Sequence, residues 1–465
     1  MATHYKDKKV AILGLGVEGL STAIFLKEQS AVVTILDQKT EDQIDPSLLQ
    51  EAKGLGTSFL FGKEYLAHLT AYDLIVRSPG ISSFLPEIQA AKEKGVEITS
   101  QTKLFFDLCP CRIVGVTGSK GKGTTATLIY EMLKASGLDA YLGGNIGTPP
   151  LQFLEKLTKA SVVVLELSSY QLEDLTKSPH IAVLLMIVPD HLDYHGGMSE
   201  YVEAKRNILR FQTKEDFAVV NRDYLPTHES DLYTDGQVYY VTRERSSVEQ
   251  GTFIKDNAIW IQMKGTEWKI IDTDKIALLG KHNWENAAAA AMAATLAGAT
   301  KSDIFEVLKT FEGLEHRLEF VREVQGVRYY DDSIATNPES TIAAIHSFED
   351  PKILILGGVT EGSDFTELGK VISEDLQVKA IIGIGKEWPT LKQEIAKGEE
   401  LRARSGEPII LLEGAKDMQT VVAAAAKIAV EGDVVLLSPA CKSFDMFKSY
   451  KDRGEQFKKA VNDLQ

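Results

Sequence analysis

Twice in this chain an apolar run enters a glycine-rich turn that opens a helical pattern. The first is KKVAILGLGVEGLSTAIFL, where Gly14, Gly16 and Gly19 have the spacing Gly-x-Gly-x-x-Gly and Asp37 ends the next apolar run. The second is CRIVGVTGSKGKGTTATLIYEML. A strand, a glycine turn and a helix in this order begin a βαβ unit, so both segments predict an α/β protein built on doubly wound sheets.

The rest of the chain continues this pattern. SVVVLELSS and HIAVLLMIV are continuous apolar runs, typical of buried parallel strands. Between about 214 and 280, short alternating runs such as GQVYYVTRE predict a small β-rich excursion. NAAAAAMAATLAGAT predicts a packed helix, and KILILGGV, AIIGIG, PIILLE and DVVLLSP then alternate with helical stretches.

With 465 residues the chain is too long for one core. We therefore predict three domains, a Rossmann-like N-terminal domain over 1–100, a central domain over 101–313 and a Rossmann-like C-terminal α/β domain over 314–465. The central domain is expected to hold a P-loop ATPase-type parallel sheet together with the β-rich excursion.

Composition excludes several classes of protein. A net charge of -15 argues against a general binder of nucleic acids or anionic membranes, because these polyanions would be repelled. Cys109, Cys111 and Cys441 are too few for a disulfide framework, and CPC at 109–111 fits ordinary packing better than a zinc site. Without a signal peptide or an apolar run of roughly 20 residues, we expect a cytoplasmic protein that does not insert into membranes.

The second glycine turn predicts a phosphate site, although it departs twice from the Walker pattern. Val116 stands where the pattern has its first glycine, and Gly123 stands where a hydroxyl usually binds Mg²⁺. The loop still has flexible glycines, Lys122 before the helix, and Thr124 as a neighbouring hydroxyl. The alternative is a turn that only caps a helix. The first turn leaves more open, because Gly-x-Gly-x-x-Gly serves dinucleotides, other nucleotides or close packing alone.

TGSKGKGTT resembles the TGxxGK[ST][ST] loop of the Mur ligases, the ATP-dependent amino-acid-adding enzymes of peptidoglycan synthesis. Further matching motifs follow in order: GGNIGTP at 143–149, LELSSYQLE at 165–173, DHLDYHG at 190–196, YVEAKRNI at 201–208, GKHNWENAAAA at 280–290, FEGLEHRLE at 311–319, DDSIATNPES at 331–340 and SPACKSFDMFKSYKDRGEQF at 438–457. GLGVEGLS and RSPGI at 77–81 most resemble the branch that adds D-glutamate to UDP-N-acetylmuramoyl-L-alanine.

The resemblance implies an ATP-dependent amide ligase that forms an acyl phosphate, acts as a monomer and takes those two small molecules as substrates. It also implies two Mg²⁺ sites, one at Thr124 and Glu166 and the other at His191 and a carbamylated Lys205. Lys122, Glu166, His191 and Lys205 would be the catalytic residues. The implied ATP-binding residues are Gly118, Ser119, Lys120, Gly121, Lys122, Gly123, Thr124, Thr125, Asn283, Asn286, Arg317 and Asp332.

The same resemblance assigns the other two substrates. The residues implied for UDP are Leu15, Gly16, Val17, Asp37, Gln38, Ser78, Pro79 and Gly80, and those for the sugar-peptide part are Asn145, Ser168, Gln171 and His191. The residues implied for the incoming amino acid are Thr336, Glu361, Ser443, Phe444 and Tyr450. UDP would therefore occupy the first glycine turn.

Two departures concern the amino acid. Ile334 stands where the D-glutamate branch usually has a lysine, and Glu361 falls nearest the position of a second lysine or arginine. A dicarboxylate without a cation is costly to bind, so either Lys442 and Lys448 serve instead or the amino acid differs. The alternatives are thus a Mur-type ligase for another amino acid and a catalytically impaired nucleotide-binding homologue. Two other enzyme classes are less favoured. Folylpolyglutamate synthase shares the central and C-terminal domains but lacks the first domain, and an NAD-dependent oxidoreductase would leave the second glycine turn unexplained.

Overall fold

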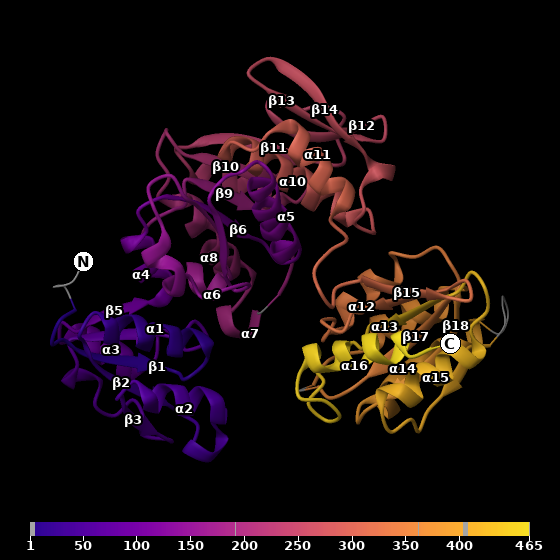
Figure 1. The fold of residues 1–465 in the computed structure, drawn as a ribbon, viewed down its shortest axis with the longest axis horizontal. Helices are drawn as coiled ribbons and strands as arrows, with labels where there is room; N and C mark the ends of the chain where they lie inside the picture. Colours follow the sequence, from indigo (N-terminus) through magenta and orange to yellow (C-terminus); the bar gives the residue numbers. More distant parts are fainter. Residues whose placement is uncertain (1–4, 191, 361, 403–407, 465) are drawn as a thin grey trace. The chain divides into compact units, whose positions relative to one another are not determined.

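The computed structural model describes residues 5–190, 192–360, 362–402 and 408–464. Its strands form three sheets of five, nine and six strands (Figure 1). The chain divides into two compact units, one of residues 1–275 and 284–309 and the other of 276–283 and 310–465. The first unit holds two of the sheets, and the second unit holds the third.

The first sheet has the strand order β3-β2-β1-β4-β5 and is parallel throughout. Its strands are β1 (Lys9–Leu13), β2 (Val32–Asp37), β3 (Ser58–Phe61), β4 (Leu74–Arg77) and β5 (Glu97–Ser100). Its helices are α1 (Val17–Glu28), α2 (Pro46–Gly54), α3 (Pro86–Glu93) and α4 (Gln101–Leu108). The order reverses between β1 and β4, so the loops at their carboxyl ends form the usual ligand crevice of such a sheet.

The second sheet has the order β14-β13-β12-β11-β10-β9-β6-β8-β7. Its strands are β6 (Arg112–Thr117), β7 (Ala140–Gly144), β8 (Val162–Glu166), β9 (Ile181–Leu184), β10 (Phe217–Asn221), β11 (Gln237–Thr242), β12 (Gly251–Lys255), β13 (Ala258–Met263) and β14 (Thr266–Asp272). Pairing is parallel from β7 to β12 and antiparallel from β12 to β14. The predicted β-rich excursion is therefore an extension of the central sheet.

Helices α5 (Lys122–Ala135), α6 (Ser169–Leu172), α7 (Leu192–His195), α8 (Met198–Arg210), α9 (Leu225–His228), α10 (His282–Ala297) and α11 (Lys301–Thr310) accompany this sheet in the sequence. The runs VVVLE of β8 and IAVL of β9 are buried at every residue, as continuous apolar strands must be when both faces are covered. Residues 287–294 of α10 are also all buried, which explains why the helix is apolar on every side.

The third sheet has the order β15-β16-β20-β17-β18-β19. Its strands are β15 (Glu319–Val324), β16 (Val327–Asp331), β17 (Lys352–Gly357), β18 (Val378–Ile384), β19 (Ile410–Leu412) and β20 (Val434–Leu437). Its helices are α12 (Pro338–Ile345), α13 (Thr366–Glu374), α14 (Trp388–Arg402), α15 (Met418–Ile428) and α16 (Tyr450–Asn462). Only β15 is antiparallel to its neighbour, and two separate apolar clusters include residues from this sheet.

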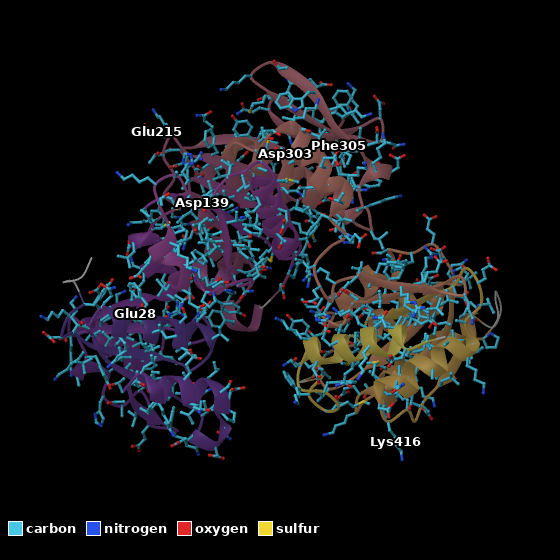
Figure 2. The ribbon with its side chains drawn as sticks, viewed as in Figure 1. Glu28, Asp139, Glu215, Asp303, Phe305 and Lys416 are labelled. Carbon is cyan, nitrogen blue, oxygen red and sulfur yellow. The ribbon has the colours of Figure 1, made fainter. Side chains whose placement is uncertain are left out.

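These three sheets confirm the predicted α/β class, whereas the domain boundaries at 100 and 313 stay predictions. Charged side chains such as Glu28, Glu215 and Lys416 are exposed on the surface of their units (Figure 2). Within the described ranges, no helix combines the length and the apolar character needed to cross a membrane.

The first glycine turn gives a test of this packing. A Cβ atom on Gly19 would lie 2.0 Å from the backbone oxygen of Gly14, whereas one on Gly54 at the end of α2 would meet open space. We expect Gly19→Ala to destabilise the first unit by about 1–3 kcal/mol through overpacking. Gly54→Ala is the control and should leave stability unchanged or raise it by less than about 1 kcal/mol. Thermal unfolding of both variants checks this, and equal melting temperatures would contradict it.

Candidate functional site

The second glycine turn has the shape of a phosphate cradle. Gly118 has φ +155° and Gly121 has φ +85°, which L side chains rarely adopt. A Cβ atom on Gly118 would lie 2.8 Å from Cβ of Leu185, and one on Gly121 would lie 2.2 Å from Oδ1 of Asn286. The turn then enters α5 directly, so the first backbone N–H groups of a 14-residue helix face its concave side.

Lys122 folds back over this turn. Its Nζ donates to the carbonyl oxygens of Gly118, at 3.1 Å, and of Ser119, at 2.9 Å. The ammonium therefore lies at the loop. A bound phosphate would give it charged oxygen acceptors in place of the two neutral carbonyls.

Ser119 and Tyr201 fix the loop from below. The Ser119 hydroxyl donates to the Val188 carbonyl at 2.7 Å, accepts from the Val188 N–H at 3.0 Å and lies 2.9 Å from the Tyr201 hydroxyl. Both side chains are buried. The structure thus places Ser119, predicted for ATP, with its hydroxyl turned into the protein rather than toward the cradle.

Glu166 ends β8 beside the loop strand. The pairing of β6 with β8 sets Val116 opposite Glu166, and the Glu166 carboxylate is buried. Asn145 donates its side-chain N–H to Oε1 of Glu166 at 3.2 Å and its backbone N–H to the Glu166 carbonyl at 2.9 Å. Thr124, in the first turn of α5, is buried as well. Glu166 and Thr124 thus offer a carboxylate and a hydroxyl at the end of the sheet where the phosphate loop starts.

Lys205 of α8 is the unusual cation of this site. Its side chain is 1% exposed, its Nζ donates to the Gly118 carbonyl at 2.9 Å, and it lies 4.7 Å from the centre of the Tyr201 ring. Burial and then the nearby charge of Lys122 hold the pKa of the Lys205 amine well below its usual range, while Asp190 and Glu166 oppose this shift. A lowered pKa makes the neutral, nucleophilic form of this amine easier to reach than that of an exposed lysine.

Helix α10 supplies the two predicted amides. Asn286 lies against the phosphate loop, with its Oδ1 3.5 Å from the Thr125 hydroxyl. Asn283 belongs to the second unit, where its Nδ2 donates to the Leu279 carbonyl at 2.6 Å. Both side chains are buried. Asn286 is therefore placed beside the predicted ATP loop, whereas Asn283 is described only within its own unit.

The first glycine turn is held by Asp37, the acid that ends β2. Asp37 accepts from the Leu15 N–H at 2.8 Å through one oxygen and from the Lys39 N–H at 2.9 Å through the other. A Cβ atom on Gly14 would lie 2.8 Å from the Ser78 hydroxyl oxygen, so this turn packs on the turn after β4. The predicted UDP residues from these two loops, together with Gln38, thus gather at the crevice of the first sheet.

Gln171 connects this crevice to the central sheet. Its Nε2 donates to Oε1 of Glu18 in α1 at 2.9 Å, and its Oε1 accepts from the Ser168 N–H at 3.0 Å. Ser168 and Gln171 form a reciprocal cap at the start of α6. Burial raises the pKa of the Glu18 carboxyl, and the Gln171 hydrogen bond opposes that shift. The sequence did not single out Glu18.

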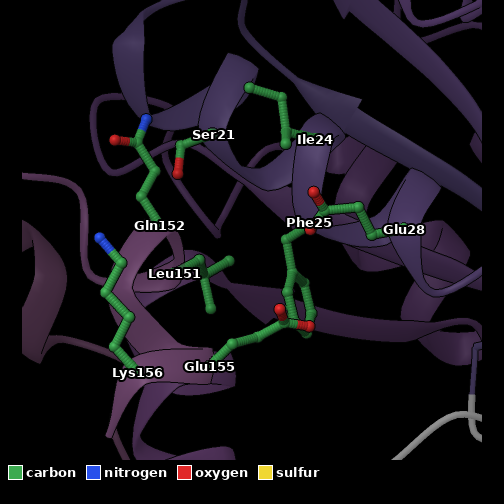
Figure 3. Close-up of a pocket in the computed structure, with 8 residues that line it drawn as sticks. All are labelled: Ser21, Ile24, Phe25, Glu28, Leu151, Gln152, Glu155 and Lys156. Carbon is green, nitrogen blue, oxygen red and sulfur yellow. The ribbon is translucent and has the colours of Figure 1, made fainter.

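A separate hollow of about 420 Å³ lies between α1 and the short helix over Pro150–Lys156 (Figure 3). Its floor includes the buried side chains Phe25 and Leu151, and Glu28, Glu155 and Lys156 are exposed at its edge. None of the predicted site residues lines it, so it is not the predicted active site.

In the second unit Asp332 is buried at the end of β16. It accepts from the Ser438 hydroxyl at 2.7 Å and from the Leu318 N–H at 3.2 Å. Burial raises the pKa of Asp332 to about 7, against the effects of the Ser438 hydrogen bond and the Arg317 charge. The Nε of Arg317 is buried and makes no hydrogen bond to any described residue. Arg317 and Asp332, both predicted for ATP, thus share one environment.

His316, just before Arg317, has the strained φ of +63° and is buried. Its ring Nδ1 lies 2.7 Å from a carboxylate oxygen of Asp331, and its backbone N–H donates to Oε2 of Glu319 at 2.7 Å. Burial lowers the pKa of His316, but the hydrogen bond and charge of Asp331 outweigh this, and the net shift is upward. This pair holds the chain just before Arg317, and the Leu318–Asp332 hydrogen bond holds it just after.

The loops predicted for the amino acid are joined by a residue that the sequence did not single out. Arg453 of α16 is fully buried and donates to the Ser333 hydroxyl at 2.9 Å, the Ser333 carbonyl at 2.7 Å and the Cys441 carbonyl at 3.0 Å. It therefore ties the 331–337 segment to the 438–444 segment. Its only signal was its place in the motif SYKDRGEQF, because a lone arginine in an amphipathic helix predicts a solvated side chain.

The other predicted amino-acid residues surround this tie in the second unit. Ser443 is buried and Phe444 is 69% exposed, while Thr336 and Tyr450 are half-buried. The Tyr450 ring lies 6.1 Å from the His316 ring. Two predicted residues lie outside the described residues. They are His191, predicted for the metal and the UDP substrate, and Glu361, predicted for the amino acid.

Three family models match this chain. They describe a "Mur ligase MurD-like, N-terminal domain" over 8–100, a "Mur ligase middle domain" over 116–294 and a "Mur ligase, glutamate ligase domain" over 316–441.

Relatives along the whole chain share the name UDP-N-acetylmuramoylalanine–D-glutamate ligase. That of Acetivibrio thermocellus is 42% identical over 99% of this chain and 97% of its own length. Those of Ruminiclostridium cellulolyticum and Symbiobacterium thermophilum are both 38% identical, over 99% and 100% of this chain and 97% and 100% of their own lengths.

Solved structures agree in fold. The Thermotoga maritima MurF ligase in complex with ADP aligns with a TM-score of 0.56 at 20% identity, over 99% of this chain and 97% of its own. The MurC ligase of the same organism aligns with a TM-score of 0.58 at 16% identity, over 98% of this chain and 99% of its own. The three family models and the full-length relatives at 38–42% identity show that the chain belongs to the Mur ligase family.

Proposed function

We propose that this protein joins D-glutamate to UDP-N-acetylmuramoyl-L-alanine at the expense of ATP. The observation that carries the proposal is the phosphate cradle of Gly118–Lys122 with Glu166 and Lys205 at its side. The substrate carboxylate would take the γ-phosphate of ATP, and the D-glutamate amine would attack the acyl carbon. An amide forms, the amine loses a proton, and phosphate and ADP leave.

The chain's own groups suit this reaction because it needs positioned charge rather than a protein nucleophile. Lys122 would leave the Gly118 and Ser119 carbonyls to meet the β- and γ-phosphates. Asn286 would hold the nucleotide from the helix that touches the loop. In the second unit, Arg317 remains a candidate for ATP, and the His316–Asp331 hydrogen bond fixes the chain just before it.

The residues at the cradle also fit Mg²⁺, which prefers carboxylate, hydroxyl and phosphate oxygens. A buried carboxylate and a buried hydroxyl, Glu166 and Thr124, stand at the loop and would hold the first ion. Mg²⁺ would neutralise charge on the phosphates when bound. Lys205 and His191 would hold the second ion.

An ammonium cannot ligate a metal, so Lys205 must first become an anion. Once deprotonated, its amine can add to carbon dioxide and lose a further proton, which gives a carbamate with two oxygen ligands. The buried position and the lowered pKa of Lys205 support this proposal. The Gly118 carbonyl, which now accepts from Nζ, would keep the remaining N–H as its donor.

The names of the relatives support D-glutamate over a different amino acid, although Ile334 and Glu361 depart from the usual pattern. The cation must then come from elsewhere. Arg453 is buried and spends its donors on backbone groups, so it supports the loops without facing the substrate. Lys442, half-buried in the 438–444 segment, is the better candidate to bind the side-chain carboxylate of D-glutamate.

Phosphate release with ATP, Mg²⁺ and UDP-N-acetylmuramoyl-L-alanine across a panel of D- and L-amino acids tests the function. We expect release that depends on D-glutamate and is lost in Lys122→Ala, because that ammonium is the cradle's cation. Lys134→Ala, an exposed lysine in the last turn of α5, serves as the control and should keep most of the rate. Release that follows another amino acid, or none, would contradict the proposal.

Lys205→Ala is expected to lower the rate by at least about 100-fold, because a charged group at the phosphates is lost. Added acetate or formate should recover part of this rate by supplying the missing carboxylate. Lys122→Ala gives the matched control, since its loss of a cation cannot be repaired by an acid. A failure of short acids to raise the Lys205→Ala rate would leave the carbamate without support.

Gly123→Ser is expected to lower the Mg²⁺ concentration for half-maximal rate by about two- to ten-fold, because it restores a hydroxyl ligand at the cradle. Gly54→Ser, in open space at the end of α2, controls for general effects of the substitution. A Mg²⁺ titration of phosphate release gives the result. An unchanged or higher Mg²⁺ requirement would mean that Thr124 already completes the site.

A further inference from the structure

The loop after β4 is held from inside by Arg77. The Arg77 side chain is fully buried, and its Nη1 donates to the carbonyl oxygens of Pro79, at 3.2 Å, and of Ile81. These two bonds bracket the turn Ser78–Gly80, which is the turn assigned above to UDP. Arg77 therefore sets the conformation of that turn without facing the crevice.

The same guanidinium reaches the central sheet. Its Nη2 donates to Oδ2 of Asp174 at 3.0 Å, just after α6. Beside it the Ser83 hydroxyl donates to Oε1 of Glu173 at 3.3 Å. Two neighbouring acids that follow α6 thus bind the loop after β4 at two points, and we call Arg77, Ser83, Glu173 and Asp174 the acidic clasp.

The far side of the clasp is also fixed. The Tyr194 hydroxyl of α7 donates to Oε2 of Glu173 at 3.1 Å. Burial raises the pKa of Tyr194 to about 12, the charge of Glu173 adds to this shift, and Arg77 opposes it. Glu173 is therefore held between α7 and the loop after β4, which restricts where that loop can lie.

Stability alone does not account for this arrangement. Nε of Arg77 and Oδ1 of Asp174 are buried and make no hydrogen bond to any described residue. Desolvation of a buried ion pair largely offsets its attraction, and incomplete hydrogen bonding adds to the cost. What the pair supplies is direction, because a guanidinium fixes three acceptors in one plane.

We propose that Arg77 is a positioning residue for the UDP end of the substrate, acting through the acidic clasp. The segment Ser168–Gln171 directly precedes the clasp acids and contacts Glu18 of α1 from the other side. The clasp thus fixes the position of the turn Ser78–Gly80 relative to α6. A substrate that contacts the turn and α6 would then find both already ordered. This inference rests on the proposed function, because it takes that turn to be the UDP site.

A prepared turn lowers the ordering cost of binding, so loosening it should weaken UDP more than it slows chemistry. Arg77→Lys keeps the charge, but one ammonium nitrogen cannot reproduce the planar spacing of Nη1 and Nη2, which bond the loop and Asp174 separately. Asp174→Asn keeps the shape but removes the charge. In both variants we expect the Kd for UDP and the KM for the UDP substrate to rise about three- to thirty-fold, with kcat within about two-fold.

Three readouts separate this role from a merely structural one. The Kd for ADP, which reports the phosphate cradle, should stay unchanged in both variants. The double variant Arg77→Lys/Asp174→Glu should recover part of the UDP affinity, because the longer acid meets the shorter cation. Arg328→Lys is the control, since Arg328 pairs with Asp350 at 2.9 Å in the second unit and should leave UDP affinity unchanged.

Calorimetric titration with UDP and ADP decides the matter, with thermal unfolding run alongside. UDP affinity that stays at the wild-type level in Arg77→Lys and Asp174→Asn, with or without a fall in melting temperature, would overturn this inference alone. A wild-type protein that does not bind UDP would overturn the proposed function as well.

Glu173→Gln supplies a second route if the buried pair cannot be altered without unfolding. It leaves Arg77 and Asp174 in place and weakens the Ser83 and Tyr194 contacts, because a carboxylate acceptor becomes an amide. We expect a smaller rise in the Kd for UDP, about two- to five-fold, with the Kd for ADP unchanged. No rise would overturn the inference.

Discussion

The pairing of β6 with β8 and β9 is the constraint on which the first unit's site depends. Its register sets Val116 opposite Glu166 and Thr117 opposite Leu184, so three strands end together. The phosphate loop, the carboxylate and the segment that carries Met186 and Val188 then meet at one edge. A one-residue slip would set the Glu166 carboxylate opposite a different residue of β6 and away from the start of the loop, so the geometry of the site depends on this register.

Much of this arrangement could be predicted from the sequence, because it follows from local rules. Continuous apolar runs predicted the buried strands, and the glycine turns predicted the two ligand crevices. The partners of β11–β14 could not be predicted, since alternation indicates a strand but not its neighbour. The pattern of α8 marks Lys205 as a solvated lysine, and only the family resemblance singled it out.

Arg453 and Glu18 escaped notice for a related reason. Both are charged residues in helices, and residue type alone places such side chains at the surface. Each is recruited instead by a partner distant in sequence, Ser333 for Arg453 and Gln171 for Glu18. Arg77 and Asp174 are likewise partners that lie far apart in the sequence. In an acidic chain with few local signals for anion binding, buried charges hold loops while the turns themselves supply backbone N–H groups.

The tie made by Arg453 also has a consequence for the order in which the protein is made. Ser333 and Arg453 are 120 positions apart, so a ribosome completes the 331–337 segment long before it adds the arginine that holds it. Strand β16 likewise cannot form its parallel pairing until β20 has been synthesised. The nascent second unit therefore cannot tie its 331–337 segment to its 438–444 segment until α16 emerges, and a chain released before Arg453 would lack this tie altogether.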